Sequence, residues 1–105
     1  MGSITCIILT KNEEKNLPSA LQNAASWADE ILVVDSGSDD GTVEIAKKSG
    51  ASVIYRAWDG DFAAQRNFAL TGAHGDWVLY LDADERLTAG AIQKVLACLL
   101  YTSDA

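Results

Sequence analysis

The chain has 105 residues, of which 49% are hydrophobic and 22% charged, with eight glycines and one proline. This balance is typical of one small globular domain and excludes a disordered, collagen-like or coiled-coil chain. Fifteen acidic residues against eight basic ones give a formal net charge of −7, and no Lys/Arg cluster interrupts the acidity. The composition therefore argues against a nucleic-acid partner.

No apolar run reaches the roughly 20 residues that cross a bilayer, and the N-terminus lacks the basic and apolar regions of a secretory signal. We therefore expect a cytoplasmic chain without a transmembrane segment. Cys6 and Cys98 have neither a metal-ligand spacing nor a disulfide framework, so both are expected to be reduced thiols with structural roles.

Strand-length apolar runs alternate with amphipathic stretches of helical length, which predicts the α/β class, with βαβ units around a mainly parallel sheet. The expected elements, in chain order, are a strand at 4–9, a helix at 13–26, a strand at 30–35, a helix at 42–49, a strand at 51–55, a helix at 61–73, a strand at 77–81 and a helical stretch at 89–100. Pro18 fits a helix only in its first turn, and Gly50 is placed to end the second helix.

Polar and acidic residues follow three of the expected strands. They are Thr10-Lys11-Asn12-Glu13, Asp35-Ser36-Gly37-Ser38 and Asp82-Ala83-Asp84-Glu85. In an open α/β sheet the ligand site lies outside the carboxyl ends of the strands. So many carboxylates would repel one another and any anionic ligand unless a divalent cation neutralised them, and oxygen ligands suit Mg²⁺ or Mn²⁺. We expect a metal-bridged phosphate ligand at this edge.

Each candidate also has a plainer interpretation. Asp82 and Asp84 are separated by one residue and can share a metal, or they can form a solvated acidic turn. Asp35 can accept hydrogen bonds from a nucleobase, or it can cap an Asx-type turn. Arg66, in a mostly apolar helix, can reach a diphosphate or pair with a surface carboxylate.

The aromatic residues and the single histidine give weaker signals. Trp27, Trp58 and Trp77 are expected to pack in the core or at its rim, with Trp58 a secondary candidate for lining a site. His74 lies in a glycine-flanked turn and is expected to be exposed.

Four segments, residues 4–13, 33–42, 65–67 and 81–85, together resemble the nucleotide-binding half of family 2 glycosyltransferases with the GT-A fold. The order and spacing of these motifs carry the resemblance, which covers residues 3–91. It is most similar to bacterial enzymes of lipopolysaccharide core biosynthesis, where the second-strand loop also reads Asp-Ser-Gly-Ser. The implied fold is a three-layer α/β/α, Rossmann-like GT-A half, here truncated.

The resemblance implies roles for six residues. Thr10 and Glu13 would lie against the nucleotide, Asp35 would bind the base, Arg66 would face the diphosphate, Asp82 would hold the ribose or the metal, and Asp84 would be the principal ligand of Mn²⁺ or Mg²⁺. The implied reaction moves a sugar from a nucleoside diphosphate sugar, with a UDP-sugar favoured, to a saccharide or lipid-linked acceptor. The implied setting is cell-envelope lipopolysaccharide synthesis.

In inverting members of the family, the carboxylate base comes from the second half of the fold, beyond the segment present here. Every carboxylate at the strand ends is already assigned to nucleotide or metal, so no general base remains. We therefore expect the fragment to be inactive alone. Its full-length parent is expected in the cytoplasm, or peripherally at the inner membrane.

Residues 1–97 are expected to form the partial glycosyltransferase domain, and residues 98–105 a tail of doubtful origin that departs from the family pattern. Two other interpretations stay open. One is a nucleotide-binding remnant without catalysis. The other is a haloacid-dehalogenase-like phosphatase, whose Asp-x-Asp motif also follows an apolar strand but continues with Thr or Val, whereas Glu85-Arg86 follow here.

Overall fold

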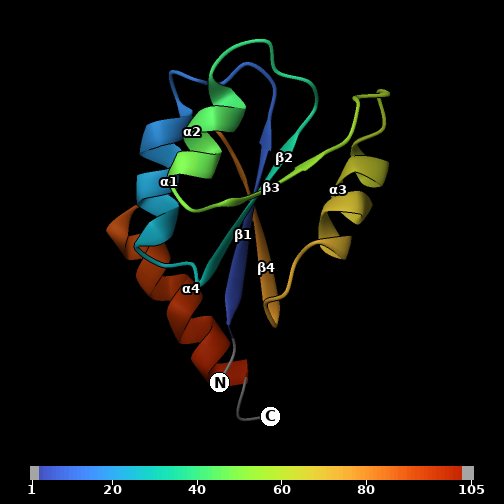
Figure 1. The fold of residues 1–105 in the computed structure, drawn as a ribbon. Helices are drawn as coiled ribbons and strands as arrows, with labels where there is room; N and C mark the ends of the chain where they lie inside the picture. Colours follow the sequence, from blue (N-terminus) through green and yellow to red (C-terminus); the bar gives the residue numbers. More distant parts are fainter. Residues whose placement is uncertain (1–2, 103–105) are drawn as a thin grey trace.

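The computed structural model describes residues 3–102, with side chains as far as Ala97, and shows a four-stranded sheet with helices on both faces (Figure 1). The strands are β1 (Ile4–Thr10), β2 (Glu30–Asp35), β3 (Ser52–Tyr55) and β4 (Trp77–Asp82). The helices are α1 (Leu17–Ala25), α2 (Thr42–Lys48), α3 (Phe62–Thr71) and α4 (Ala89–Thr102). All strand pairs are parallel, so the expected α/β/α fold is confirmed.

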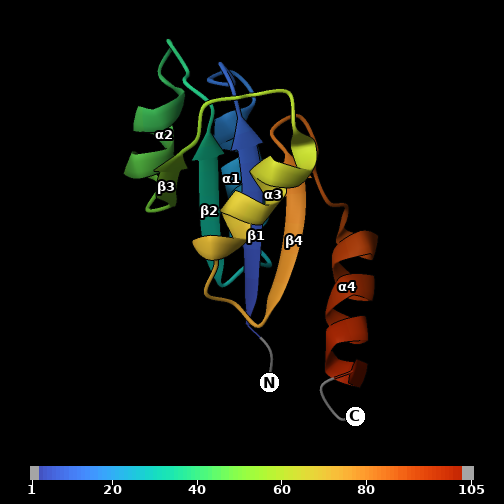
Figure 2. The ribbon, with the colours of Figure 1, turned by 90° about the vertical axis from the view of Figure 1, so that its right-hand side faces the viewer.

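The strands lie in the order β3-β2-β1-β4, so the chain extends to one side of β1 and then returns to its other side. The segment that carries α3 makes this return by crossing the sheet (Figure 2). In the register, Thr10 pairs with Asp35 and Leu9 pairs with Asp82. The carboxyl ends of β1, β2 and β4 therefore open together at the point where the strand order reverses, which is where ligands bind in open α/β sheets.

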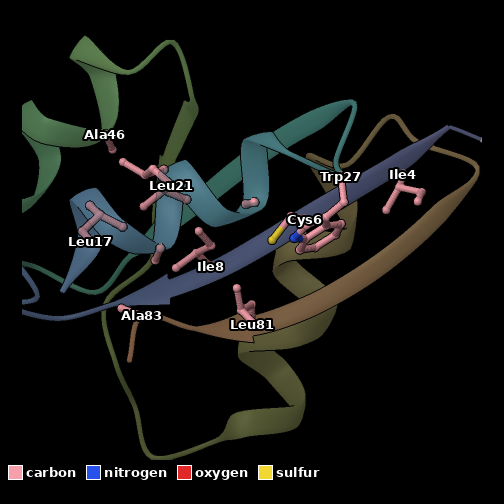
Figure 3. Close-up of a cluster of buried hydrophobic side chains, with 12 residues drawn as sticks. Ile4, Cys6, Ile8, Leu17, Leu21, Trp27, Ala46, Leu81 and Ala83 are labelled. Atoms are coloured by element: carbon pink, nitrogen blue, oxygen red, sulfur yellow. The ribbon is translucent and has the colours of Figure 1, made fainter. Parts of the chain in front are cut away.

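Two hydrophobic cores hold the layers together, because successive residues of a strand face opposite sides of the sheet. The larger core lies between the sheet and α1 and α2, where Ile8, Leu21 and Ala46 are among its buried members (Figure 3). The smaller core lies under α3, and its buried members are Ile7, Leu32, Val34 and Ala69. Burial of both faces explains why β1 and β2 read as almost continuous apolar runs.

One predicted boundary is wrong by four residues, since α1 begins at Leu17 and not at Glu13. Asn12 adopts a left-handed conformation with φ 54°, and the N–H groups of Asn16 and Leu17 both donate to the carbonyl of Glu13. These bonds form a separate turn ahead of the helix. Pro18 lies in the first turn of α1 as predicted.

The cysteine prediction is confirmed for Cys6, which is a buried free thiol. Burial raises the pKa of Cys6 to about 12, so the thiol stays protonated at neutral pH and fills space in the core. The side chain of Cys98 lies outside the described residues. The backbone of α4 continues to Thr102, residues 103–105 lie outside the described part, and the proposed boundary at residue 97 stays a prediction. Within residues 3–102, no helix is long and apolar enough to span a membrane.

Candidate nucleotide and metal site

A cavity of about 410 Å³ lies at the carboxyl ends of β1, β2 and β4. The residues that line it are Leu9, Thr10, Lys11 and Glu13 at the end of β1, Ser36 after β2, Trp58, Phe62 and Gln65 from the segment between β3 and the middle of α3, and Asp82, Ala83 and Asp84 at the end of β4. Four residues selected from the sequence, Thr10, Glu13, Asp82 and Asp84, therefore face the same cavity. Asp35 and Arg66 do not line it.

Asp35 is buried beside Thr10 and organises the loop after β2. Its Oδ1 accepts hydrogen bonds from the Thr10 hydroxyl at 2.8 Å and the Ser38 hydroxyl at 2.6 Å. Its Oδ2 accepts from the N–H groups of Gly37 at 2.9 Å and Ser38 at 2.8 Å. Burial opposes ionisation, but these hydrogen bonds outweigh it and lower the pKa of Asp35. Asp35 thus forms the Asx-type turn, and its contact with a base stays a prediction.

Hydrogen bonds between the loops after β1 and β2 fix the rim of the cavity. The N–H of Asn12 donates to Ser38 Oγ at 2.8 Å, and Asn12 Oδ1 accepts from the N–H of Asp39 at 2.7 Å. The N–H of Glu13 donates to Thr42 Oγ1 at 2.9 Å. Glu13 is therefore held at the rim although it belongs to no helix or strand.

Asp82 and Asp84 lie in a tight acidic turn at the end of β4. The N–H of Glu85 donates to the Asp82 carbonyl at 2.9 Å, and Glu85 Oε1 accepts from the N–H of Asp82 at 2.8 Å. Partial burial and the negative charges of Glu85 and Asp84 raise the pKa of Asp82, while the positive charge of Arg66 opposes the rise. The turn thus concentrates negative charge that a cation would neutralise.

Arg86 fastens this acidic turn to the start of α1. Its guanidinium donates to the carbonyl of Ala83 at 2.7 Å and to the carbonyl of Asn16 at 2.8 Å. It also donates to Ser19 Oγ at 2.9 Å. Sequence reasoning did not select Arg86, which fixes the position of the turn between Asp82 and Glu85.

The donor set of this turn fits Mg²⁺ or Mn²⁺. Asp82 and Asp84 both line the cavity and both carry carboxylate oxygens, and hard divalent cations prefer oxygen ligands. Among the described side chains, no group of three or more His, Cys, Asp or Glu converges on one metal position. The protein would therefore supply two carboxylates and leave the other positions to water and phosphate, which is the usual coordination of Mg²⁺ in phosphate sites.

Arg66 lies outside the cavity, on the exposed side of α3. Its guanidinium carbon is 5.3 Å from the centroid of the Tyr80 ring, within the range of a cation–π contact. The Tyr80 hydroxyl donates to the Arg66 carbonyl at 3.1 Å. The predicted role of Arg66 at a diphosphate stays a prediction, and it requires the side chain to leave Tyr80.

Gln65, singled out from the sequence only as part of the 65–67 motif, lines the cavity, and Arg56 contacts it; neither residue was assigned a role from the sequence. Gln65 is only 1% exposed, donates from Nε2 to Ser36 Oγ at 3.2 Å and accepts from Arg56 Nη1 at 2.8 Å. Gln65 lies four residues before the buried Ala69, so both side chains are on the face of α3 that packs on the sheet. A polar residue on an apolar helical stripe was the signal that could have identified it.

The three tryptophans lie in different parts of the fold, and His74 contacts Glu30. Trp58 lines the cavity, Trp27 belongs to the larger core, and Trp77 is partly exposed at the opposite end of the sheet. His74 is exposed as expected, and its Nδ1 lies 2.9 Å from Glu30 Oε2.

A parallel sheet with a cavity at the carboxyl ends of its strands, where the strand order reverses, defines an α/β protein of the doubly wound type. Within this class, the chain belongs to glycosyl transferase family 2, whose family model matches residues 5–102. This assignment confirms the resemblance to family 2 glycosyltransferases found in the sequence, and it excludes the haloacid-dehalogenase-like phosphatase.

Three comparisons illustrate the relationship. The chain is 44% identical over 88 residues to an uncharacterized glycosyltransferase of Rickettsia typhi, covering 84% of this chain and 30% of that protein. It is 40% identical over 87 residues to a TPR repeat-containing protein of Synechococcus elongatus, covering 83% of this chain and 22% of that protein. The fold is similar to glucosyl-3-phosphoglycerate synthase from Mycobacterium tuberculosis in complex with Mn²⁺, UDP and glucosyl-3-phosphoglycerate, with TM-score 0.67, 25% identity and coverage of 81% and 36%. The chain thus spans well under half the length of each.

Proposed function

We propose that this chain binds the nucleotide part of a sugar donor, as the donor half of a metal-dependent glycosyltransferase. The observation that carries the proposal is the convergence of Thr10, Glu13, Asp82 and Asp84 on one cavity at the strand ends. The mycobacterial neighbour, described in complex with Mn²⁺ and UDP, supports both ligand classes. UDP is the nucleotide we favour, and the sugar it carries is the group transferred.

In this proposal Asp84 and Asp82 hold Mn²⁺ or Mg²⁺. When bound, the cation supplies charge neutralisation at the leaving diphosphate. Thr10 and Glu13 position the nucleotide at the end of β1, and Arg66 turns from Tyr80 toward the diphosphate. Asp35 reaches the base only if one of its present donors moves, because its two oxygens already accept four hydrogen bonds, about their full capacity.

Transfer to an acceptor hydroxyl also needs a general base within hydrogen-bond reach. The carboxylates that line the cavity are Glu13, Asp82 and Asp84, and each has a role at the nucleotide or the metal. We therefore propose that the chain binds donor without sustained turnover, and that the whole enzyme uses a saccharide or lipid-linked acceptor. Sustained sugar transfer from a panel of nucleotide sugars by the 105-residue chain would contradict this.

The biological setting of the whole enzyme is a further part of the proposal. The Asp-Ser-Gly-Ser sequence at residues 35–38 resembles lipopolysaccharide core enzymes, so we propose a role in bacterial envelope synthesis. A lipid-linked acceptor would place the whole enzyme at the cytoplasmic face of the inner membrane.

Calorimetry with UDP tests the binding proposal. We expect UDP to bind in the presence of Mn²⁺ and its affinity to fall at least about tenfold in EDTA, because two phosphates and two carboxylates repel without the cation. Asp84→Asn should remove the metal dependence. Glu44→Gln, an acid-to-amide change on the exposed side of α2, should not. Metal-independent UDP binding would contradict the metal assignment, and absence of UDP binding would contradict the function.

A further inference from the structure

Two aromatic side chains of the cavity lining have no role in the site described so far. Trp58 and Phe62 are 46% and 65% exposed, and both line the cavity. Their ring centroids are 4.7 Å apart and their planes make an angle of 64°, an edge-to-face pair. A large aromatic ring that lines a cavity and is left about half in water, as Trp58 is, offers a face on which a flat ring can stack.

Charged contacts hold this pair in place. Arg56 and Asp59 form an ion pair at 2.8 Å, and Asp59 Oδ1 accepts from the N–H of Asp61 at 3.0 Å. Asp61 in turn caps α3 by accepting from the N–H of Ala64 at 3.0 Å. The segment that carries Trp58 therefore has a fixed path where it crosses above the strand ends (Figure 2).

A polar edge lies next to the aromatic pair. Phe62 and Gln65 are three residues apart on α3 and so share a face of the helix. Gln65 donates to Ser36 Oγ, which leaves the Ser36 hydroxyl proton free to point into the cavity that both residues line. This side of the cavity combines aromatic rings with a hydrogen-bond donor, whereas the polar residues on the side formed by the end of β4 are the acidic Asp82 and Asp84.

We propose that Trp58 stacks on the base of the bound nucleotide, with the Phe62 ring inclined to that stack, while the Ser36 hydroxyl donates to the edge of the base. This inference rests on the proposed function. It assigns the base of the nucleotide to one side of the cavity and the diphosphate to the other. A nucleobase fits this side because it presents a π face and hydrogen-bond acceptors on one flat ring. The diphosphate and its cation then lie on the acidic side.

The test uses UMP in EDTA, so that the base is present and the metal is absent. We expect UMP to quench the tryptophan fluorescence of the wild-type chain, and Trp58→Phe, which keeps Trp27 and Trp77, to lose that quenching. Ribose 5-phosphate, which has no base, should not quench. By calorimetry, Trp58→Ala should weaken UMP binding about tenfold, as expected for loss of base stacking. Trp58→Phe should retain most of the affinity.

Trp77→Ala is the matched control, since it removes a partly exposed tryptophan at the opposite end of the sheet. It should leave UMP affinity unchanged.

Equal affinity of Trp58→Ala and wild type for UMP would overturn the inference, as would quenching by ribose 5-phosphate. So would a Trp58→Ala effect seen with UDP-glucose but not with UDP, because the ring would then contact the sugar. If one of these outcomes is observed and the wild-type chain still binds UDP with Mn²⁺, the stacking inference fails and the proposed function stands. If wild type binds neither nucleotide, the proposed function fails with it.

Discussion

Thr10 donates its hydroxyl proton to the carboxylate of Asp35 across the paired ends of β1 and β2, at 2.8 Å. Each residue is only 3% exposed, so neither group can exchange its partner for bulk water. The bond joins the two strands at the floor of the site. It therefore links the stability of the fold to the shape of the cavity above it.

Thr10→Val should lower the free energy of unfolding by about 1–3 kcal/mol, because it keeps the side-chain shape but removes a donor to a buried carboxylate. Thr10→Ser keeps the hydroxyl and should cost less. Urea denaturation followed by circular dichroism measures both. If the serine variant were the less stable of the two, the packing of the methyl group and not the hydrogen bond would hold this position.

The stability conferred by Asp35 should depend on pH. Hydrogen bonds lower its pKa in the folded state against the opposing effect of burial, below the unfolded value of about 3.9. The ionised carboxylate therefore stabilises the fold above about pH 4, and this contribution is lost as the pH falls through the folded pKa. The difference in unfolding free energy between wild type and Asp35→Asn should be largest near neutral pH and shrink below about pH 4.

The pH experiment needs Asp35→Asn because the pKa values of other carboxylates, among them Asp40 and Asp59, are lowered as well, chiefly by hydrogen bonds. The pKa of Glu30 is also lowered, since hydrogen bonds from His74 and Thr5 outweigh its burial. These other carboxylates contribute equally to both proteins, so the difference between the two unfolding free energies isolates Asp35. A difference that stays constant from pH 6 to pH 3 would show that Asp35 has the same pKa in both states.

The order of elements and the position of the acidic turn could be predicted from the sequence because their signals are local. An apolar strand followed by Asp82 and Asp84 is visible in a few residues. The contact of Gln65 with Ser36 could not be predicted, since it depends on how the segment after β3 crosses the strand ends. The orientation of Arg66 toward Tyr80 likewise depends on the rotation of α3 against β4, which no local pattern determines.

Arg66→Ala should weaken binding of UDP more than binding of UMP. A guanidinium that moves from the Tyr80 ring to the ligand would contact the second phosphate, which only UDP carries. We expect about a tenfold loss for UDP with Mn²⁺ and a smaller loss for UMP, measured by calorimetry. Tyr80→Phe keeps the ring and should leave both affinities near wild type. Equal losses for UDP and UMP would place Arg66 away from the diphosphate.

The same glycine-to-alanine change should have opposite effects at Gly75 and Gly90. A Cβ at Gly75 would lie 2.6 Å from Thr5 Oγ1 and 2.7 Å from the Thr5 backbone nitrogen, so the start of β1 would have to shift. Gly75→Ala should therefore lower stability by about 1–3 kcal/mol. A Cβ at Gly90 in α4 meets no atom within 4 Å, and Gly90→Ala should raise stability by up to about 1 kcal/mol by reducing the freedom of the unfolded chain. Thermal unfolding of both variants measures the two effects, and a shift of the same sign in both would contradict the close packing of residue 75 against β1.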